Sequence, residues 1–288
     1  MKQKKLLCLL FFLLLQNGIW AELPGHGAYV AQEEVLLSEI SKGDIMQLPP
    51  LIQATTLEGD YKAMADLGLA FTSLSSQEDP GQAYENILCS CVRVQVDGHY
   101  GSGSIFRLLE NEMIIVTNRH VLQYWNEDSY VTFFNGAVVG GTPIGVSKEA
   151  DVGFVSIPVA SFTYEELLGY RNVRVPVKAV TGKEADTCIE VLSEGSGIFF
   201  VDMATDWTDP MRIDGSVIAP LIYLEDFQTE MFYGKGEAIP GMSGCGVFDD
   251  YGNYVGMMTG GTLQGEIAAV PVQVIIVEYE KIVGSKFG

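Results

Sequence analysis

Short runs of alternating apolar and polar positions fill the chain from about residue 84 onward. Dipeptides such as Asp97-Gly98 and Asn135-Gly136 separate several runs, and such pairs are typical of two-residue β-hairpin turns. Many short strands at this spacing predict a sandwich or a barrel. The predicted strands lie at residues 91–96, 105–106, 113–117, 130–134, 138–139, 152–157, 188–192, 197–201, 217–224, 246–248 and 254–258.

Helical spacing replaces this alternation towards both ends of the chain. In residues 22–82, which carry ten acidic residues and two lysines, apolar positions recur at helical intervals on both sides of Pro49-Pro50. We therefore predict a helical acidic extension there, and leave open whether it is a pro-segment, a stalk or a decoration packed on the main domain. Residues 272–283 have helical spacing as well, and this predicts a C-terminal helix.

The first 21 residues have the parts of an export signal. Three lysines precede an unbroken apolar run at residues 6–15, and the segment ends at Ala21, a small residue suited to signal peptidase. That run is too short to span a hydrocarbon core of about 30 Å. We predict a cleaved signal peptide at residues 1–21 and a secreted or extracytoplasmic protein. Because Ile19 is larger than the best cleavage sites prefer, an uncleaved N-terminal membrane anchor is the alternative.

The charge balance is strongly acidic and restricts the class of partner. The chain has 17 Lys and Arg residues against 37 Asp and Glu residues, a formal net charge of −20. A phosphate backbone or an anionic membrane surface needs a basic face, so we expect neither nucleic acid nor a membrane surface as a partner. With 48% hydrophobic and 19% charged residues, the composition is that of a globular chain.

Histidine and cysteine are too sparse to indicate a metal centre. The chain has three histidines and five cysteines. Cys89 and Cys91 form a pair that lacks the second pair or nearby histidine of a structural zinc site. Together with Cys188 and Cys245, they are expected to be buried thiols or to include one disulfide. We predict no metal and no cofactor.

Three short segments place reactive side chains at strand boundaries. His120 follows an apolar run, Asp151 begins a strand, and Ser243 lies between Gly241 and Gly244 just before a strand. Glycine at 241 lets the backbone turn two N–H groups toward one point, as an oxyanion hole requires. Taken singly, the segments also have ordinary explanations, namely a structural histidine, a strand start and a tight turn.

Taken together, the three segments predict a hydrolytic triad. Amide hydrolysis by a covalent route needs an activated hydroxyl, a base that titrates near neutral pH, and an acid that orients the base. Ser243, His120 and Asp151 supply these residue types in the chain order His, Asp, Ser. The other two histidines compete poorly as the base, because His99 lies beside a turn and His26 lies in the N-terminal extension.

The ordered motifs resemble those of trypsin-like serine proteases with the two-barrel chymotrypsin fold, closest to the bacterial HtrA/Deg type. Thr117-Asn118-Arg119-His120-Val121 is similar to the family motif T-N-x-H-V, and Asp151 begins a similar hydrophobic strand. Ile239-Pro240-Gly241-Met242-Ser243-Gly244 is similar to the nucleophile loop N-P-G-N-S-G. Two further segments match the strand before the histidine and the strand after the substrate-binding segment, namely Gly101-Ser102-Gly103-Ser104-Ile105 and Ala268-Ala269-Val270-Pro271.

The resemblance implies an all-β fold of two six-stranded antiparallel β-barrels, with the C-terminal helix and the helical extension added. It implies that Ser243 is the nucleophile, His120 the general base and Asp151 the orienting acid. The backbone N–H groups of Gly241 and Ser243 would form the oxyanion hole. Thr259-Gly260-Gly261 resembles the strand edge along which a polypeptide substrate pairs as an added strand.

The implied protease domain covers residues 83–288 and departs from the family pattern at two positions. Met242 stands where trypsins have an aspartate that pairs with a newly cut N-terminus, and Cys245 replaces a glycine. Too few residues follow Ser243 for the PDZ domain that many HtrA proteins carry. The activity expected is that of a serine endopeptidase, and the alternative is a catalytically inactive binding module of the same fold on the cell surface.

Glu237 is a candidate for the floor of the primary specificity pocket, because it lies six residues before Ser243. A carboxylate there would favour Arg or Lys before the scissile bond. The other interpretation is an exposed loop in a very acidic chain, since Gly234 and Gly236 lie close by. The natural substrate and the oligomeric state stay open.

Overall fold

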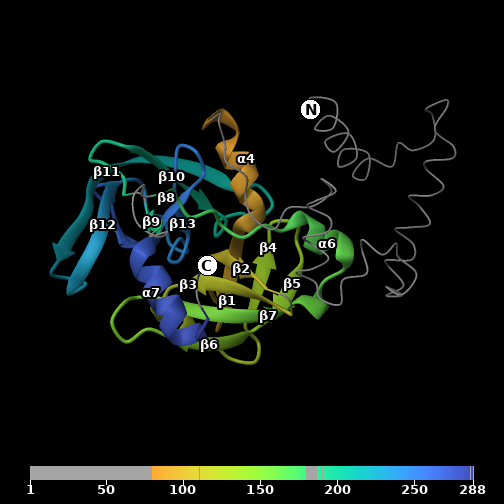
Figure 1. Cartoon of the computed structure of the whole chain (residues 1–288). Helices are drawn as coiled ribbons and strands as arrows, with labels where there is room; N and C mark the ends of the chain where they lie inside the picture. The colour runs from red at the N-terminus through yellow and green to blue at the C-terminus, as the bar shows by residue number, and fades with distance from the viewer. Residues whose placement is uncertain (1–79, 110, 180–186, 190, 286, 288) are drawn as a thin grey trace, which may run out of the picture. The chain divides into compact units, whose positions relative to one another are not determined.

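The computed structural model describes residues 80–288, apart from residues 110, 180–186, 190, 286 and 288 (Figure 1). The predicted signal peptide and nearly all of the predicted extension at residues 22–82 lie outside the described residues, so both stay predictions. Within the described part of the chain, no helix is both long enough and apolar enough to cross a membrane.

Short helical segments precede the first strand. They are Pro80–Gln82 (η2), Ala83–Ile87 (α4) and Leu88–Ser90 (η3). Ala83 and Ile87 are the buried residues of α4 and lie one helical turn apart, so this segment packs through one helix face and not through alternation. The first strand begins at Cys91, as the sequence pattern predicts.

Seven antiparallel strands form the first sheet, in the order β5-β4-β1-β2-β3-β7-β6 (Figure 1). The hairpin between β1 and β2 turns at Asp97 and Gly98, as predicted, with φ angles of 44° and 75°. Positive φ at both central residues is what a type I′ hairpin turn requires. The strands are Cys91–Val96 (β1), His99–Leu108 (β2), Glu112–Thr117 (β3), Tyr130–Phe133 (β4), Val138–Gly140 (β5), Thr142–Val146 (β6) and Gly153–Pro158 (β7).

The second sheet is a closed antiparallel barrel with the order β10-β11-β12-β15-β14-β13. Two short strands, Val177–Ala179 (β8) and Thr187–Ile189 (β9), pair with each other before it. Three short helical segments lie within or after the first sheet, namely Arg119–Leu122 (α5), Val159–Ser161 (η4) and Tyr164–Gly169 (α6). The barrel strands are Gly197–Asp202 (β10), Met211–Leu224 (β11), Thr229–Lys235 (β12), Gly246–Asp249 (β13), Tyr254–Gly261 (β14) and Glu266–Pro271 (β15).

The all-β prediction with two antiparallel sheets is confirmed, and the first sheet differs in detail from the six-stranded barrel expected. It has seven strands, and among the described residues its end strands β5 and β6 pair with their inner neighbours and not with each other. The ends are poorly suited to close the sheet. Strand β5 has three residues, and β6 contains Pro143, which has no N–H to donate to a ladder.

The C-terminal helix α7 (Val272–Val283) has the bounds that its periodicity predicts and ends at Gly284 with a φ of 76°. It contacts β14 and β15 of the barrel and β6 of the first sheet. Its buried Tyr279 lies 5.4 Å from Phe106 and 5.6 Å from Phe154, ring centroid to ring centroid. Since Phe106 also lies 6.2 Å from Tyr254 of the barrel, one aromatic cluster joins both sheets and α7.

We expect Phe106→Ala to lower the free energy of unfolding by about 3–5 kcal/mol, because it would leave a cavity at the centre of this cluster. Urea unfolding followed by tryptophan fluorescence measures the change. Val138→Ala is the control, since Val138 is 58% exposed and should change stability by less than about 0.5 kcal/mol. Equal effects of the two variants would contradict the role assigned to the cluster.

Candidate active site

His120 lies just beyond the end of β3, in the short helix α5. Val121 and Leu122 are buried and fix this helix against the first sheet, while the side chain of His120 is 43% exposed. The imidazole therefore stands at the surface on a backbone that is anchored on both sides, because β3 enters the core immediately before it. This arrangement suits a base that must meet a substrate.

Asp151 lies just before β7, and both of its carboxylate oxygens bind His120. Oδ1 accepts a hydrogen bond from the backbone N–H of His120 at 3.0 Å, and Oδ2 lies 2.7 Å from Nδ1 of the ring. The Asp151 side chain is only 14% exposed, so the pair is largely shielded on the acid side. Asp128, another acid near His120 in sequence, is exposed, and its own N–H donates to Asn126 Oδ1 at 3.0 Å.

The loop that leads into Asp151 is held by local hydrogen bonds. Ser147 Oγ accepts from the backbone N–H groups of Glu149 and Ala150 at 3.0 and 2.9 Å. Arg119, the neighbour of His120, donates from Nη1 to the carbonyl oxygen of Ser147 at 3.1 Å. The segments that carry the base and the acid are thus tied together beyond their own contact.

The loop that carries Ser243 depends on two glycines with positive φ. Gly241 has a φ of 98° and Gly244 a φ of 92°, in the region that favours glycine. A Cβ at position 241 would lie 2.5 Å from the Cβ of Ala204, and one at position 244 would lie 2.1 Å from the carbonyl oxygen of Ser102. Neither position has room for a side chain, so both glycines are required by the loop.

Strand β2 anchors the Ser243 loop next to the His120 segment. The Ser102 N–H donates to the Ser243 carbonyl oxygen at 2.8 Å, and Ser102 Oγ donates to the Gly241 carbonyl oxygen at 3.0 Å. A Cβ at position 101 would lie 3.0 Å from the side chain of Val121 and 3.1 Å from the Ser243 carbonyl oxygen. Gly101 therefore packs between the residue after His120 and the backbone of Ser243.

No hydrogen bond joins Ser243 Oγ to His120 within the part of the chain that the structure describes. Bonds between a nucleophile and its base are often long before a substrate binds. The structure thus pairs His120 directly with Asp151. Ser243 lies near this pair because Gly101 packs against both the Ser243 backbone and Val121, the residue after His120.

The backbone N–H groups of Gly241 and Ser243 donate no hydrogen bond to any described residue, while the carbonyl groups of the same two residues are bound by Ser102. The two donors predicted for the oxyanion hole are therefore uncommitted.

Met242 and Cys245 point away from solvent and into the core of the barrel. Burial, with a smaller contribution from the charge of Asp202, raises the pKa of the Cys245 thiol. Burial likewise raises the pKa of Cys89 to about 11 and holds that of Cys91 well above its ordinary value. These three cysteines are free thiols, and since the thiolate is the reactive form, none competes with Ser243 as the nucleophile.

The end of β14 is formed by Thr259, Gly260 and Gly261. Although β14 pairs with both β13 and β15, this end has a strand partner on one edge only. Gly260 and Gly261 pair with Ala268 and Ile267 of β15. On the other edge, the pairing of β14 with β13 ends at Met257, and no described strand continues it. This open edge is where the sequence resemblance locates an added substrate strand.

Glu237 is exposed and lies in the segment between β12 and the Ser243 loop. Its neighbour Ala238 packs against β14, since a Cβ at position 261 would lie 2.3 Å from the Cβ of Ala238. The segment with Glu237 therefore runs beside the open end of β14. The sequence pattern did not indicate that Phe227, in the turn between β11 and β12, lies near the end of β14. Its Cζ is 3.6 Å from the Cβ position of Gly260.

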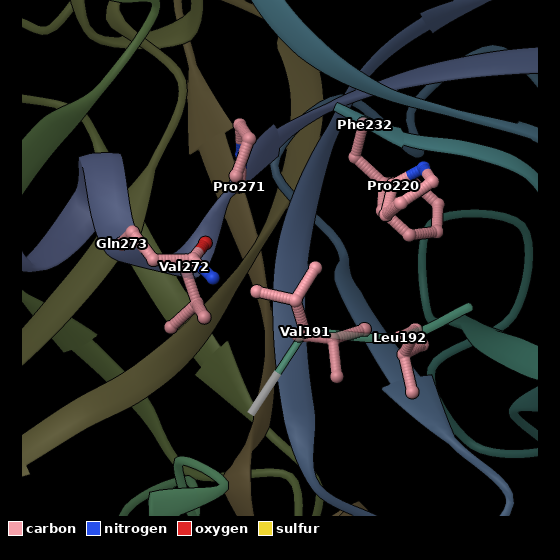
Figure 2. A pocket seen from close by; sticks show the side chains of 8 residues that line it. Val191, Leu192, Pro220, Phe232, Pro271, Val272 and Gln273 are labelled. Atoms are coloured by element: carbon pink, nitrogen blue, oxygen red, sulfur yellow. The ribbon is translucent and has the colours of Figure 1, made fainter. Parts of the chain in front are cut away.

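The apolar hollow of Figure 2 is separate from the predicted site. None of its lining residues is one of the predicted site residues, and none is a nucleophile or a charged group. No group of three or more described His, Cys, Asp or Glu residues is arranged to hold a metal ion. The hollow is lined by Val191, Leu192, Pro220, Phe232, Val255, Pro271, Val272 and Gln273.

Comparison with known proteins bears on the fold. No protein-family model and no curated protein sequence matches the chain. The inactive form of a serine-to-alanine mutant of Rv3671c from M. tuberculosis H37Rv is similar with a TM-score of 0.54 and 11% identity, over 75% of this chain and 98% of that chain. A crystal structure of Deg5 is similar with a TM-score of 0.53 and 19% identity, over 71% of this chain and 94% of that chain.

A second structure of Rv3671c, described as a protease in its inactive form, has a TM-score of 0.53 and 12% identity, over 73% of this chain and 98% of that chain. At such identities the similarity shows the fold. The chain therefore has the trypsin-like serine protease fold, and the resemblance that the motifs indicate is confirmed at the level of the fold.

Proposed function

We propose that this chain is a secreted serine endopeptidase that hydrolyses peptide bonds through His120, Asp151 and Ser243 and an acyl-enzyme intermediate. The observation that carries the proposal is the double contact of the Asp151 carboxylate with the backbone N–H and with the ring of His120. The shared protease fold and the anchoring of the Ser243 loop on β2 support it. The secreted location rests on the sequence pattern of residues 1–21 alone.

In the proposed mechanism, the Asp151 contacts leave Nε2 of His120 as the nitrogen that acts as the base. An ionised carboxylate only accepts hydrogen bonds, so Nδ1 carries the proton and Nε2 is left as an acceptor. Nε2 then takes the proton from Ser243 Oγ as this oxygen attacks the peptide carbonyl carbon, and the imidazolium returns the proton to the leaving amine. A water molecule, activated by the same nitrogen, releases the acyl group.

Negative charge develops on the carbonyl oxygen during both attacks. The N–H groups of Gly241 and Ser243 would bind this oxygen, and each such donor contributes roughly 2.7–4 kcal/mol to stabilising the transition state. Neither N–H is committed to another described residue. No reorganisation is then needed to free these donors when substrate binds.

The substrate is proposed to be a polypeptide that adds as a strand to the open edge of β14. Main-chain hydrogen bonds to Thr259, Gly260 and Gly261 would align the chain in a manner that depends little on its sequence. Phe227 and Ala238 lie against the Cβ positions of Gly260 and Gly261, so the substrate strand would pair with the backbone edge of these residues.

The test is the hydrolysis of an unstructured protein, such as reduced casein, and of a mixed peptide library, with new termini identified by mass spectrometry. Wild-type protein should generate cleavage products that Ser243→Ala does not. If the two proteins generate none, and bind the polypeptide equally well, the chain is the non-catalytic binding module that shares this fold.

Glu237 gives a prediction about substrate choice. As a pocket carboxylate, it should produce a preference for Arg or Lys before the scissile bond that persists at high salt, because a poorly hydrated contact is screened little. Glu237→Gln should remove this preference, while Glu230→Gln, which removes an exposed charge from β12, should keep it. Peptide profiling at low and high ionic strength measures both. A preference that fades as salt rises would instead assign the effect to the overall negative charge of the chain.

A further inference from the structure

Asn118 is a buried amide at the junction of the two sheets, two residues before His120. It occupies the N-cap position of α5, yet its side chain makes no cap hydrogen bond. Asparagine at this position usually binds the helix N–H groups. Here its side chain is fully buried and is used elsewhere.

Both contacts of the Asn118 amide reach residues distant in the sequence. Nδ2 donates to the backbone carbonyl oxygen of Asp151 at 2.9 Å and to Thr259 Oγ1 at 3.1 Å. An amide nitrogen has two hydrogens, so both are used. The orientation of the amide is fixed as well, because the Asp151 carbonyl is purely an acceptor and would repel Oδ1.

The remaining atom, Oδ1, is buried and has no hydrogen-bond partner among the described residues. Burying an acceptor without a partner costs free energy, which an apolar side chain of the same shape would avoid. The side chain is therefore better explained by its two donor contacts than by packing.

These two contacts connect the triad with the proposed substrate strand. Asp151 lies just before β7 of the first sheet and is held at its carboxylate by His120 and at its carbonyl by Asn118. Thr259 belongs to the barrel, at the start of the open edge of β14. We propose that Asn118 is a positioning residue that keeps the orienting acid and the substrate strand in one fixed arrangement. This inference rests on the proposed function and adds a residue to it.

The kinetic test uses variants that keep the shape of the side chains. Asn118→Leu should lower kcat roughly 100-fold, the scale expected for a small misplacement of catalytic groups, with little change in KM. Thr259→Val should lower kcat about tenfold, and the double variant should be no worse than Asn118→Leu alone, because both changes remove the same contact. Thr259→Ser keeps the hydroxyl that Asn118 contacts, so its kcat should be higher than that of Thr259→Val.

Asn253→Ala is the control for a loss of stability alone. It removes the 2.6 Å bond from Asn253 Nδ2 to Asp249 Oδ2 in the turn between β13 and β14, and kcat should not change. A wild-type kcat in Asn118→Leu, or equal rate losses in Asn118→Leu and Asn253→Ala, would overturn the positioning role.

A second readout does not need activity. In a Ser243→Ala background, the Nδ1 proton of His120 should give a downfield NMR resonance that is protected from exchange by Asp151. Asn118→Leu should broaden or abolish it, whereas the resonances of His99, which is exposed, should not change. The chain has only three histidines, so the assignment is direct.

The NMR readout separates the two proposals. An unchanged His120 resonance in folded Asn118→Leu contradicts the positioning role, whether or not the wild type hydrolyses peptides. A resonance that responds in a chain without peptidase activity supports the positioning role and contradicts the proposed function.

Discussion

Alanine at Ser243 or at His120 is expected to remove peptide hydrolysis to a similar extent, with kcat falling roughly a million-fold in each case. In the proposed mechanism Ser243 supplies the attacking oxygen and His120 is the base that Asp151 contacts, so either loss should disable the same step. Because the residues act as a unit, the double variant should be no slower than the single variants. Initial rates with a fluorogenic peptide measure the loss.

Matched replacements elsewhere test whether the effect is specific. His99 lies at the start of β2 and Ser161 in η4, and both are exposed. His99→Ala and Ser161→Ala should keep the wild-type rate. Substantial activity in Ser243→Ala would exclude Ser243 as the nucleophile.

Asparagine at Asp151 is expected to leave the fold intact and to lower kcat about 10⁴-fold. The two carboxylate oxygens bind the His120 N–H and Nδ1, and asparagine has only one oxygen. If that oxygen keeps the backbone N–H, the amide nitrogen faces Nδ1 and donates to it. The ring proton then moves to Nε2, which can no longer accept the proton of Ser243.

Asp128→Asn is the control for this variant, since Asp128 is exposed and its N–H donates to Asn126 and not to the ring of His120. Circular dichroism should show the same fold for both variants, and only Asp151→Asn should be slow. Full activity in Asp151→Asn would require another acid to orient His120.

Features with strong local signals could be predicted from the sequence. The Asp97-Gly98 turn is set by two residues that accept positive φ. Helix α7 has a buried face at Val272, Ile275 and Tyr279, and its periodicity marks both of its ends. The His120 and Asp151 segments are adjacent strand boundaries of one sheet, so their pairing follows once β3 and β7 are recognised.

Elements held by distant partners could not be predicted in the same way. Strand β6 has no buried residue, and it contains Pro143 and Gly145, so it shows no alternation. It exists because β7 pairs with one edge and because α7 covers it, with Ile282 2.9 Å from the Cβ position of Gly145. Because β6 has no buried residue and contains Pro143, it is poorly suited to pair with β5 at the other end of the sheet. The first sheet is therefore not the closed six-stranded barrel expected.

The contacts around the site show the same limit. The sequence marks Asn118 only as a member of a motif, while its contacts with Asp151 and Thr259 depend on the packing of one sheet against the other. Ser102 binds the backbone on both sides of Met242, and its bond to Gly241 spans 139 residues of sequence. No periodicity within the chain could show either contact.

The most direct test of the account is to treat the folded protein with a fluorophosphonate probe and to map the adduct by mass spectrometry. Such probes bond to a serine oxygen only where a base and an oxyanion hole activate it. We predict one adduct, on Ser243, which is absent in Ser243→Ala and forms much more slowly in His120→Ala. An unlabelled wild-type protein, or an adduct that persists in Ser243→Ala, would contradict it.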